Sequence, residues 1–187
     1  ITNLDSTTIL KDQKIDINFK NKELIINGQG KIKFDRNFED FKFKVSKIKN
    51  KFNFDTQVDL DQTSFKINFL DFVKNDESKT QIKVLGSYEN KNSLIFENLS
   101  IINKNNRFII KNVHLKNNLI KKLDKVNLEF LDSQNKKNII LVKKIKKNKY
   151  QITGSSFNAE KLIDSLLIDK NDNNLRLFKN DIKISLN

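Results

Sequence analysis

Cysteine, methionine, proline and tryptophan are all absent from this chain of 187 residues, and glycine occurs only 4 times. Without cysteine, the chain can form neither a disulfide framework nor a zinc site built from thiolates. No apolar run approaches the roughly 18 residues that a membrane-spanning helix needs. Because residue 1 is not methionine, we expect residues 1–187 to be a single segment of a longer chain, with any signal peptide or membrane anchor outside it.

The apolar residues that are present follow a strict pattern. Hydrophobic residues make up 37% of the chain and charged residues 32%, and Phe and Ile dominate the apolar set. Phe41, Phe43 and Val45 alternate with lysines, and the same period of two recurs over residues 52–60 and 65–69. Side chains on a strand point alternately to its two faces, so these runs predict a sheet with one apolar and one charged face.

Turn signals rich in Asn, Lys and Asp separate the apolar runs roughly every 10 to 14 residues, which is the rhythm of a β-meander. We therefore predict an all-β fold: a long curved antiparallel sheet of roughly a dozen strands, shaped like a trough. Its apolar parity is expected to face one concave side, in strands centred on Phe54, Ile67, Val84, Phe96, Phe108, Leu128 and Leu141.

One segment departs from the strand pattern. Residues 158–168 carry apolar side chains at i, i+1, i+4 and i+5, which places them on one stripe of a helix. Asn158 is a suitable N-cap and Glu160 suits the first turn. The sequence therefore predicts one short α-helix over 158–168, followed by two closing strands around 175–178 and 182–186.

The formal net charge is +13. An excess of this size has two interpretations: an acidic partner such as nucleic acid or an anionic membrane surface, or the Lys-rich codon usage of an AT-rich genome. The densest basic run is residues 143–149, and Tyr150 is the only aromatic residue beside it. Because single-stranded nucleic acids are bound through stacking aromatics, we interpret this run as solvated strand ends and expect no nucleic acid.

No catalytic constellation is evident. Gly28 and Gly30 form a Gly-x-Gly, but a strand follows them where a dinucleotide-binding fingerprint needs a third glycine and a helix. His114 is the only histidine and is predicted to face solvent. Asp55, Asp59 and Asp61 share one parity, which suits a solvated strand face better than a glycosidase pair or a calcium site. We therefore predict no enzyme activity, no metal and no cofactor.

A short motif carries a resemblance to a known family. Residues 150–163 read Tyr-Gln-Ile-Thr-Gly-Ser-Ser-Phe-Asn-Ala-Glu-Lys-Leu-Ile. A strand ending in glycine, then an aromatic, Asn or Asp, and a short Leu/Ile-rich helix resembles the AsmA-like bacterial envelope proteins, most closely their YhdP branch. Asn158 stands where that family more often has Asp. The alternating segments 24–30 and 94–101 are similar in style to the family's repeated strands.

The resemblance implies a function in lipid transport. Such proteins are tethered to the inner membrane of Gram-negative bacteria and cross the periplasm, and their apolar β-groove is thought to guide phospholipid acyl chains towards the outer membrane. The membrane anchor would lie in parts of the parent chain outside this sequence. The residues expected to contact lipid here are Phe43, Phe54, Phe65, Ile67, Phe69, Ile82, Val84, Leu94, Phe96, Phe108, Ile110, Leu128 and Phe130.

Two alternatives remain open from the sequence alone. One is a structural β-spacer of the same fold, whose interior is filled by its own side chains. The other is a basic β domain that binds nucleic acid or another polyanion. Phe fills a core as readily as it lines a groove, so the shape of the apolar face decides between the groove and the spacer.

Overall fold

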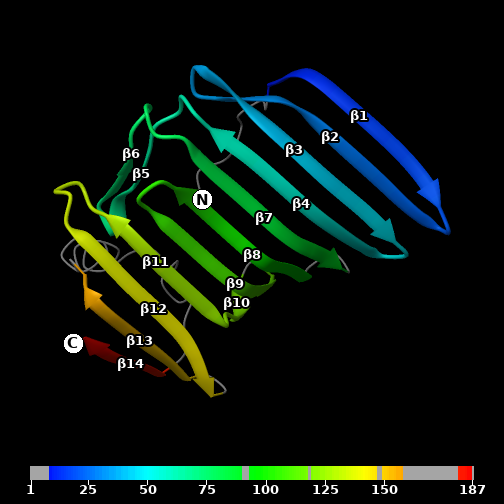
Figure 1. Ribbon diagram of the computed structural model, residues 1–187. Coiled ribbons are helices and arrows are strands. Elements are labelled where there is room, and N and C mark those ends of the chain that lie inside the picture. Colours follow the sequence, from blue (N-terminus) through cyan, green and yellow to red (C-terminus); the bar gives the residue numbers. More distant parts are fainter. Residues whose placement is uncertain (1–8, 90–92, 118, 147–148, 158–180, 187) are drawn as a thin grey trace.

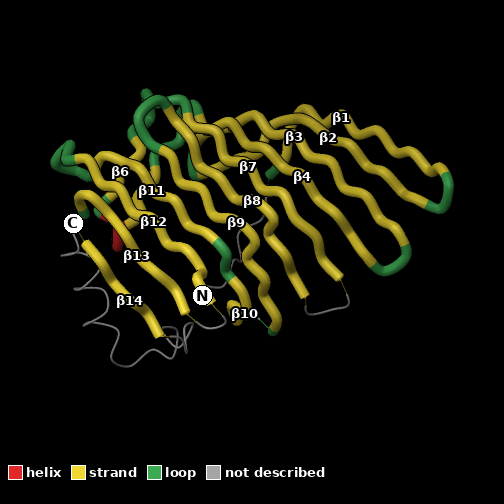
Figure 2. Tube along the Cα trace, turned by 60° about the horizontal axis from the view of Figure 1, so that its bottom comes forward, coloured by secondary structure: helices red, strands yellow, loops and turns green. Residues whose placement is uncertain are grey.

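The fold is one large, open, curved β-sheet with a small hairpin packed against it (Figures 1 and 2). The computed structural model describes residues 9–89, 93–117, 119–146, 149–157 and 181–186. The 12 strands of the large sheet are β1 (Leu10–Lys20), β2 (Glu23–Phe34), β3 (Asn37–Ile48), β4 (Lys51–Leu60), β7 (Thr80–Glu89), β8 (Ser93–Asn103), β9 (Arg107–Lys116), β10 (Leu119–Lys122), β11 (Lys125–Leu131), β12 (Lys137–Lys146), β13 (Lys149–Ser156) and β14 (Asp181–Leu186).

The predicted all-β meander is confirmed. Strands pair antiparallel in the order β1-β2-β3-β4-β7-β8-β9-β11-β12-β13, with β10 beside β9. The two outer strands, β1 and β14, do not pair, so the sheet stays open rather than closing on itself. The last pairing differs from the prediction of a fully antiparallel sheet, because β14 runs parallel to β13.

Tight turns join the first four strands. Two residues separate the last paired positions of β1 and β2, and the same holds for β2–β3 and β3–β4. Asn21, Lys22, Asp35 and Lys49 adopt positive φ in these turns. Positive φ in a two-residue hairpin matches the right-handed twist of the flanking strands, which fixes their register.

The chain leaves the large sheet between β4 and β7. Residues 65–74 form a covering hairpin made of β5 (Phe65–Ile67), a 3₁₀ turn η1 (Asn68–Leu70) and β6 (Phe72–Lys74). Both views place β6 at the end of the sheet where β11 and β12 are joined (Figures 1 and 2). The prediction that the strand around Ile67 belongs to the main sheet is therefore wrong. Its alternation is satisfied by a separate two-stranded sheet that lies on the apolar face.

The covered core is the set of buried side chains where the covering hairpin packs on the sheet: Leu70 and Phe72 of the hairpin, and Phe108, Phe130 and Ile140 of the sheet. Three of its rings meet edge-on or stacked, with centroids 4.8 Å apart for Phe72–Phe108, 5.3 Å for Phe108–Phe130 and 6.1 Å for Phe72–Phe130. Such pairs add about 0.5–1.5 kcal/mol each beyond the area they bury. The covered core therefore holds the hairpin to the sheet.

Leu141 lies on the polar face, because Leu128 pairs with Ile140 and Asn127 pairs with Leu141. The expected placement of Leu141 on the apolar face is thus wrong, since four consecutive apolar residues at 139–142 allow either parity. The predicted helix over 158–168 and the strand at 175–178 lie outside the described residues.

Candidate functional site

A continuous apolar row crosses the sheet. Residues in direct register share a face, and the pairings of ten strands link one such set without a break. We call this set the central row. It consists of Ile15, Gly28, Phe43, Thr56, Val84, Leu99, Ile110, Val126, Val142 and Ile152.

The central row is half-exposed for nearly its whole length. Gly28 is its only buried member, Ile15 is exposed, and the others are intermediate. With strands about 4.8 Å apart, ten strands extend the row over roughly 43 Å, perpendicular to the strand direction. Thr56 is its only polar side chain, so the row offers a ligand apolar contact with almost no hydrogen-bonding groups.

The apolar face divides into two regions along this row. In its open half, over β1 to β4, the described residues form a second layer only near Glu39, where residues 61–63 bind its carboxylate, and Ile17 and Phe19 on β1 are 64% and 75% exposed. In the other region the covered core lies beneath the hairpin, where Phe130 is 0% exposed. Sequence alternation is the same in both regions, but only one of them is closed.

The residues predicted to contact lipid fall into these regions. Phe65, Ile67 and Phe69 belong to the covering hairpin; the first two pack against the covered core, whereas Phe69 on η1 is exposed. All the others lie on the apolar face of the large sheet. Phe108 and Phe130 are in the covered core, and the remaining positions are half-exposed: Phe43, Phe54, Ile82, Val84, Leu94, Phe96, Ile110 and Leu128.

Two glycines leave room for phenylalanine rings of neighbouring strands on the apolar face. A Cβ atom at Gly28 would collide with the Phe43 ring of the neighbouring strand, and one at Gly86 would meet both the Phe54 ring and the Ile95 carbonyl. Phe54 in turn packs edge-on against Phe96, with centroids 6.1 Å apart. These two glycines therefore serve close packing on the apolar face, and Gly28 takes no part in a nucleotide fingerprint.

A buried carboxylate fixes the start of the covering hairpin. Glu39 lies on the apolar parity of β3, and its carboxylate accepts backbone N–H bonds from Asp61 (2.8 Å), Gln62 (2.9 Å) and Thr63 (2.6 Å). Burial raises the pKa of Glu39, but the Thr63 hydroxyl and these three N–H groups outweigh it, so the pKa lies below its usual value. The ionised carboxylate is thus part of the folded structure.

The tip of the covering hairpin is fixed to the β11–β12 turn. Ser133 donates its backbone N–H to the Asp71 carbonyl at 2.9 Å and its hydroxyl to the Asp71 carboxylate at 2.6 Å. At the other end of the hairpin, Lys74 pairs with Phe65; it is 0% exposed, and its Nζ has no hydrogen-bond partner among the described residues. Burial lowers the pKa of Lys74, and the carboxylates of Glu39, Asp61 and Asp76 partly offset this.

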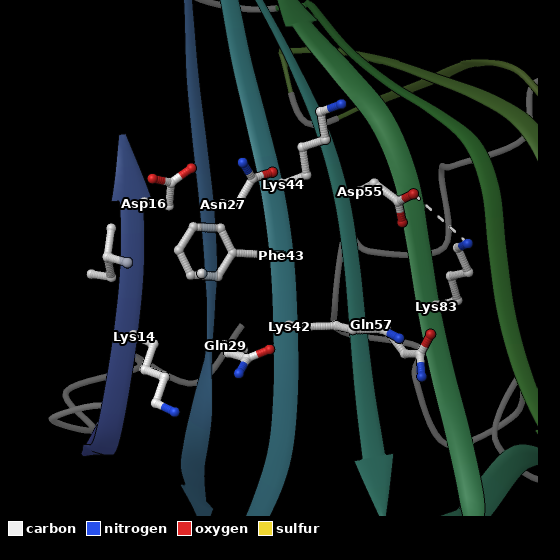
Figure 3. Close-up of a pocket in the computed structure, with 12 residues that line it drawn as sticks. Lys14, Asp16, Asn27, Gln29, Lys42, Phe43, Lys44, Asp55, Gln57 and Lys83 are labelled. Atoms are coloured by element: carbon white, nitrogen blue, oxygen red, sulfur yellow. Dashed lines mark ion pairs between the residues drawn. The ribbon is translucent and has the colours of Figure 1, made fainter. Parts of the chain in front are cut away.

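The opposite face of the sheet is polar. A shallow hollow of about 600 Å³ over β1 to β4 and β7 is lined by Lys, Asp, Asn and Gln side chains, and also by Ile15, Gly28 and Phe43 of the central row (Figure 3). Asp55 pairs with Lys83 at 3.7 Å, and Asp59 accepts hydrogen bonds from Gln57 and Gln81. Asp61 follows the end of β4 and lies 3.8 Å from Lys79. These carboxylates are engaged in separate polar contacts.

The remaining candidates are dispersed. His114 lies on the polar face opposite Ile95 and Lys122, and burial together with Lys122 and Lys144 lowers its pKa despite Asp124. Among the described residues, no group of three or more His, Cys, Asp and Glu side chains is placed to hold a metal ion. Within the same part of the chain, no helix has the length and apolarity that crossing a bilayer requires.

Sequence reasoning missed Glu39, Lys74 and Ser133. A signal existed for the first two, because each is a charged residue on an apolar parity: Glu39 precedes Phe41 and Phe43, and Lys74 follows Phe72. A charge at such a position is buried only if the fold supplies partners for it. Ser133 carried no signal, because its partner Asp71 is distant in the sequence.

Comparisons with protein-family models, curated proteins and solved structures found no match. The resemblance of residues 150–163 to the AsmA-like proteins therefore stays a prediction.

Proposed function

We propose that this chain shields phospholipid acyl chains along the central row, as part of a periplasmic protein tethered to the inner membrane that passes lipid towards the outer membrane. The observation that carries this proposal is the continuity of the row: ten strands contribute almost entirely apolar positions in unbroken register, and all of them except Gly28 are at least partly exposed. The resemblance of residues 150–163 to AsmA-like proteins agrees with it.

The chemistry of the row suits an acyl chain. Val, Ile, Leu and Phe side chains provide dispersion contact without directional hydrogen bonds, so a long methylene chain can bind in many registers and move along the row. Each buried methylene contributes about 0.8 kcal/mol. Several half-covered methylenes therefore give useful affinity while leaving the chain free to exchange.

The covered core favours a second candidate, the structural spacer. Phe72 is 1% exposed and Phe130 is 0% exposed, so part of the apolar face is filled by the protein itself. If the open half served only to pack against further protein, no lipid would occupy the central row.

Site-specific photo-crosslinking in cells distinguishes the two. A photoreactive residue at Phe43 or Val84, both in the central row, is expected to capture phospholipid. The same probe at Lys42 or Lys83, the adjacent residue on the same strand but on the polar face, is the matched control and should capture none. A probe at Phe130 should also capture none, because the covering hairpin closes that position. Equal capture on both faces, or none at Phe43 and Val84, would overturn the proposal in favour of the spacer.

A further inference from the structure

Positive charge is distributed unevenly over the polar face. Over β1 to β4 and β7, several lysines lie beside carboxylates: Lys31 pairs with Asp40 at 3.5 Å, Lys44 lies opposite Asp55, and Lys83 reaches Asp55 at 3.7 Å. Opposite charges at facing positions stabilise an antiparallel pair. Carboxylates therefore compensate part of the positive charge in this region.

The polar face of β9, β11 and β12 lacks this compensation. Lys111 lies directly opposite Lys125, which lies directly opposite Lys143, so three ammonium groups follow one another across three strands. We call these three residues the basic row. Among the described residues, no carboxylate forms an ion pair with any of them. Facing like charges destabilise a sheet, so this row is an unfavourable arrangement unless an anion lies over it.

The surroundings of the basic row add to its charge and give it an apolar component. Arg107 and Lys137 lie on the same face and share the single carboxylate of Glu129, with Lys137 at 2.8 Å. Between these cations and the basic row, Ile109 and Leu141 flank Asn127 in direct register. The hollow over β1 to β4 and β7 also contains lysines, but there the carboxylates of Asp16 and Asp55 stand among them (Figure 3).

We propose that the basic row docks onto the phosphate head groups of an anionic membrane surface. Clustered lysines with interleaved aliphatic side chains match a bilayer interface, which presents fixed negative charge above an apolar layer. No aromatic residue stands among these positions on β9, β11 and β12, whereas binding of single-stranded nucleic acid relies on stacking rings. The docking itself is independent of the proposed function. Its consequence for orientation rests on that function: the β9–β12 end of the central row would be the membrane-proximal end.

The test is binding of the chain to vesicles of phosphatidylglycerol and of phosphatidylcholine. The variant K111Q/K125Q/K143Q removes the basic row, and K14Q/K42Q/K44Q is the matched control, because it removes three exposed lysines from the polar face of β1 and β3. Both variants lower the formal net charge of +13 by the same amount. Circular dichroism checks that each remains folded.

The basic-row variant is expected to lose about tenfold or more in affinity for phosphatidylglycerol vesicles, and the control less than about threefold, with no binding of phosphatidylcholine by any form. Equal losses in the two variants would show a response to net charge alone and overturn the proposal. Tighter binding of a single-stranded oligonucleotide than of the anionic vesicles, lost in the basic-row variant, would overturn it in favour of a nucleic-acid surface.

A second measurement locates the contact. Because the chain has no cysteine, a single cysteine at Asn127 or Asn27 can carry an environment-sensitive fluorophore on the polar face of either region. Phosphatidylglycerol vesicles should shift the emission at Asn127 and leave Asn27 unchanged; the reverse pattern, or no shift at either, overturns the docking. Lipid capture at Phe43 and Val84 is measured separately, so the docking surface and the proposed function can fail independently.

Discussion

The open half and the covered core of the apolar face arise from the same alternation of Phe, Ile and Val with polar residues, yet they differ in what they do. In the covered core a hairpin supplies a second layer, and Phe130 is completely buried. In the open half, Phe19 on β1 remains 75% exposed on a well-formed strand. In the open half the strands are held by backbone pairing and by contacts between neighbouring side chains on the sheet, whereas the covering hairpin adds a second layer over the covered core. Stability should be concentrated in the covered core and ligand contact in the open half.

The largest difference is expected on truncating a phenylalanine in each region. Phe130→Ala should lower the free energy of unfolding by about 3–5 kcal/mol, because it leaves a cavity among packed rings that cannot collapse easily. Phe19→Ala should change it by less than about 0.5 kcal/mol, since that ring is largely in water. Urea denaturation followed by circular dichroism measures both. Similar losses at the two positions would contradict the division into a covered and an open region.

A smaller effect is expected at the anchor of the covering hairpin. Glu39→Gln should cost about 1.5–3 kcal/mol, because three backbone N–H groups lose an ionised acceptor. The matched control is Asp40→Asn, the next residue on β3, whose exposed ion pair with Lys31 is worth less than about 1 kcal/mol.

The pH dependence of stability tests the same role of the Glu39 carboxylate, by comparing wild-type protein with the Glu39→Gln variant. The folded pKa of Glu39 lies below its ordinary value of 4.5, so its contribution is fully present above that value and is lost as the pH falls through the folded pKa. Wild-type protein should therefore lose stability over this acid range, and the Glu39→Gln variant should lose less. Parallel acid profiles for the two proteins would rule out this role for the carboxylate.

The smallest expected effect is a gain in stability rather than a loss. Lys74→Met should raise the free energy of unfolding by about 1 kcal/mol at neutral pH, because it removes a buried ammonium group without a hydrogen-bond partner among the described residues. Since the folded pKa of Lys74 lies below its ordinary value of 10.5, the unfolded chain holds the extra proton between the two values. Wild-type stability should rise with pH across that window, and the variant should lack this rise.

Lys66→Met is the control for Lys74. Lys66 is on the facing strand of the same hairpin but is exposed, so its replacement should change stability by less than about 0.5 kcal/mol. A loss of stability in Lys74→Met would mean that the ammonium group contributes favourable contacts with Glu39 or its neighbours.

Much of the large sheet could be predicted from the sequence, because period-two alternation directly reports strands with one apolar face. Phe43, Phe54, Val84, Phe96, Phe108 and Leu128 all lie on the predicted face. The pattern failed where it was ambiguous, as at residues 139–142, where every position is apolar and the register of β12 against β11 decides which residues face the core.

The two-region architecture could not be predicted, for a different reason. Residues 65–69 alternate like any other strand, and nothing local indicates that they fold back over β9 and β11. The central row also depends on register, which shifts at a bulge between Leu85 and Gly86 in the β7–β8 pair. The bulge lies at Gly86, where a Cβ atom would meet the Ile95 carbonyl of β8; a strand glycine can mark a bulge, but it does not tell how the neighbouring strand is paired.

The order of strands has a consequence for how the chain folds. Nearly every pairing in the large sheet joins neighbours along the sequence, so each new strand needs only a short loop to be closed before it adds to the last one. The sheet can thus assemble by adding one strand after another as the chain emerges during synthesis. The bond from Ser133 to Asp71 is an exception that spans 62 residues. It cannot form until β11 has emerged, so the covering hairpin docks fully onto the sheet only late in folding. Its docking then couples the strands that paired earlier into one cooperative unit.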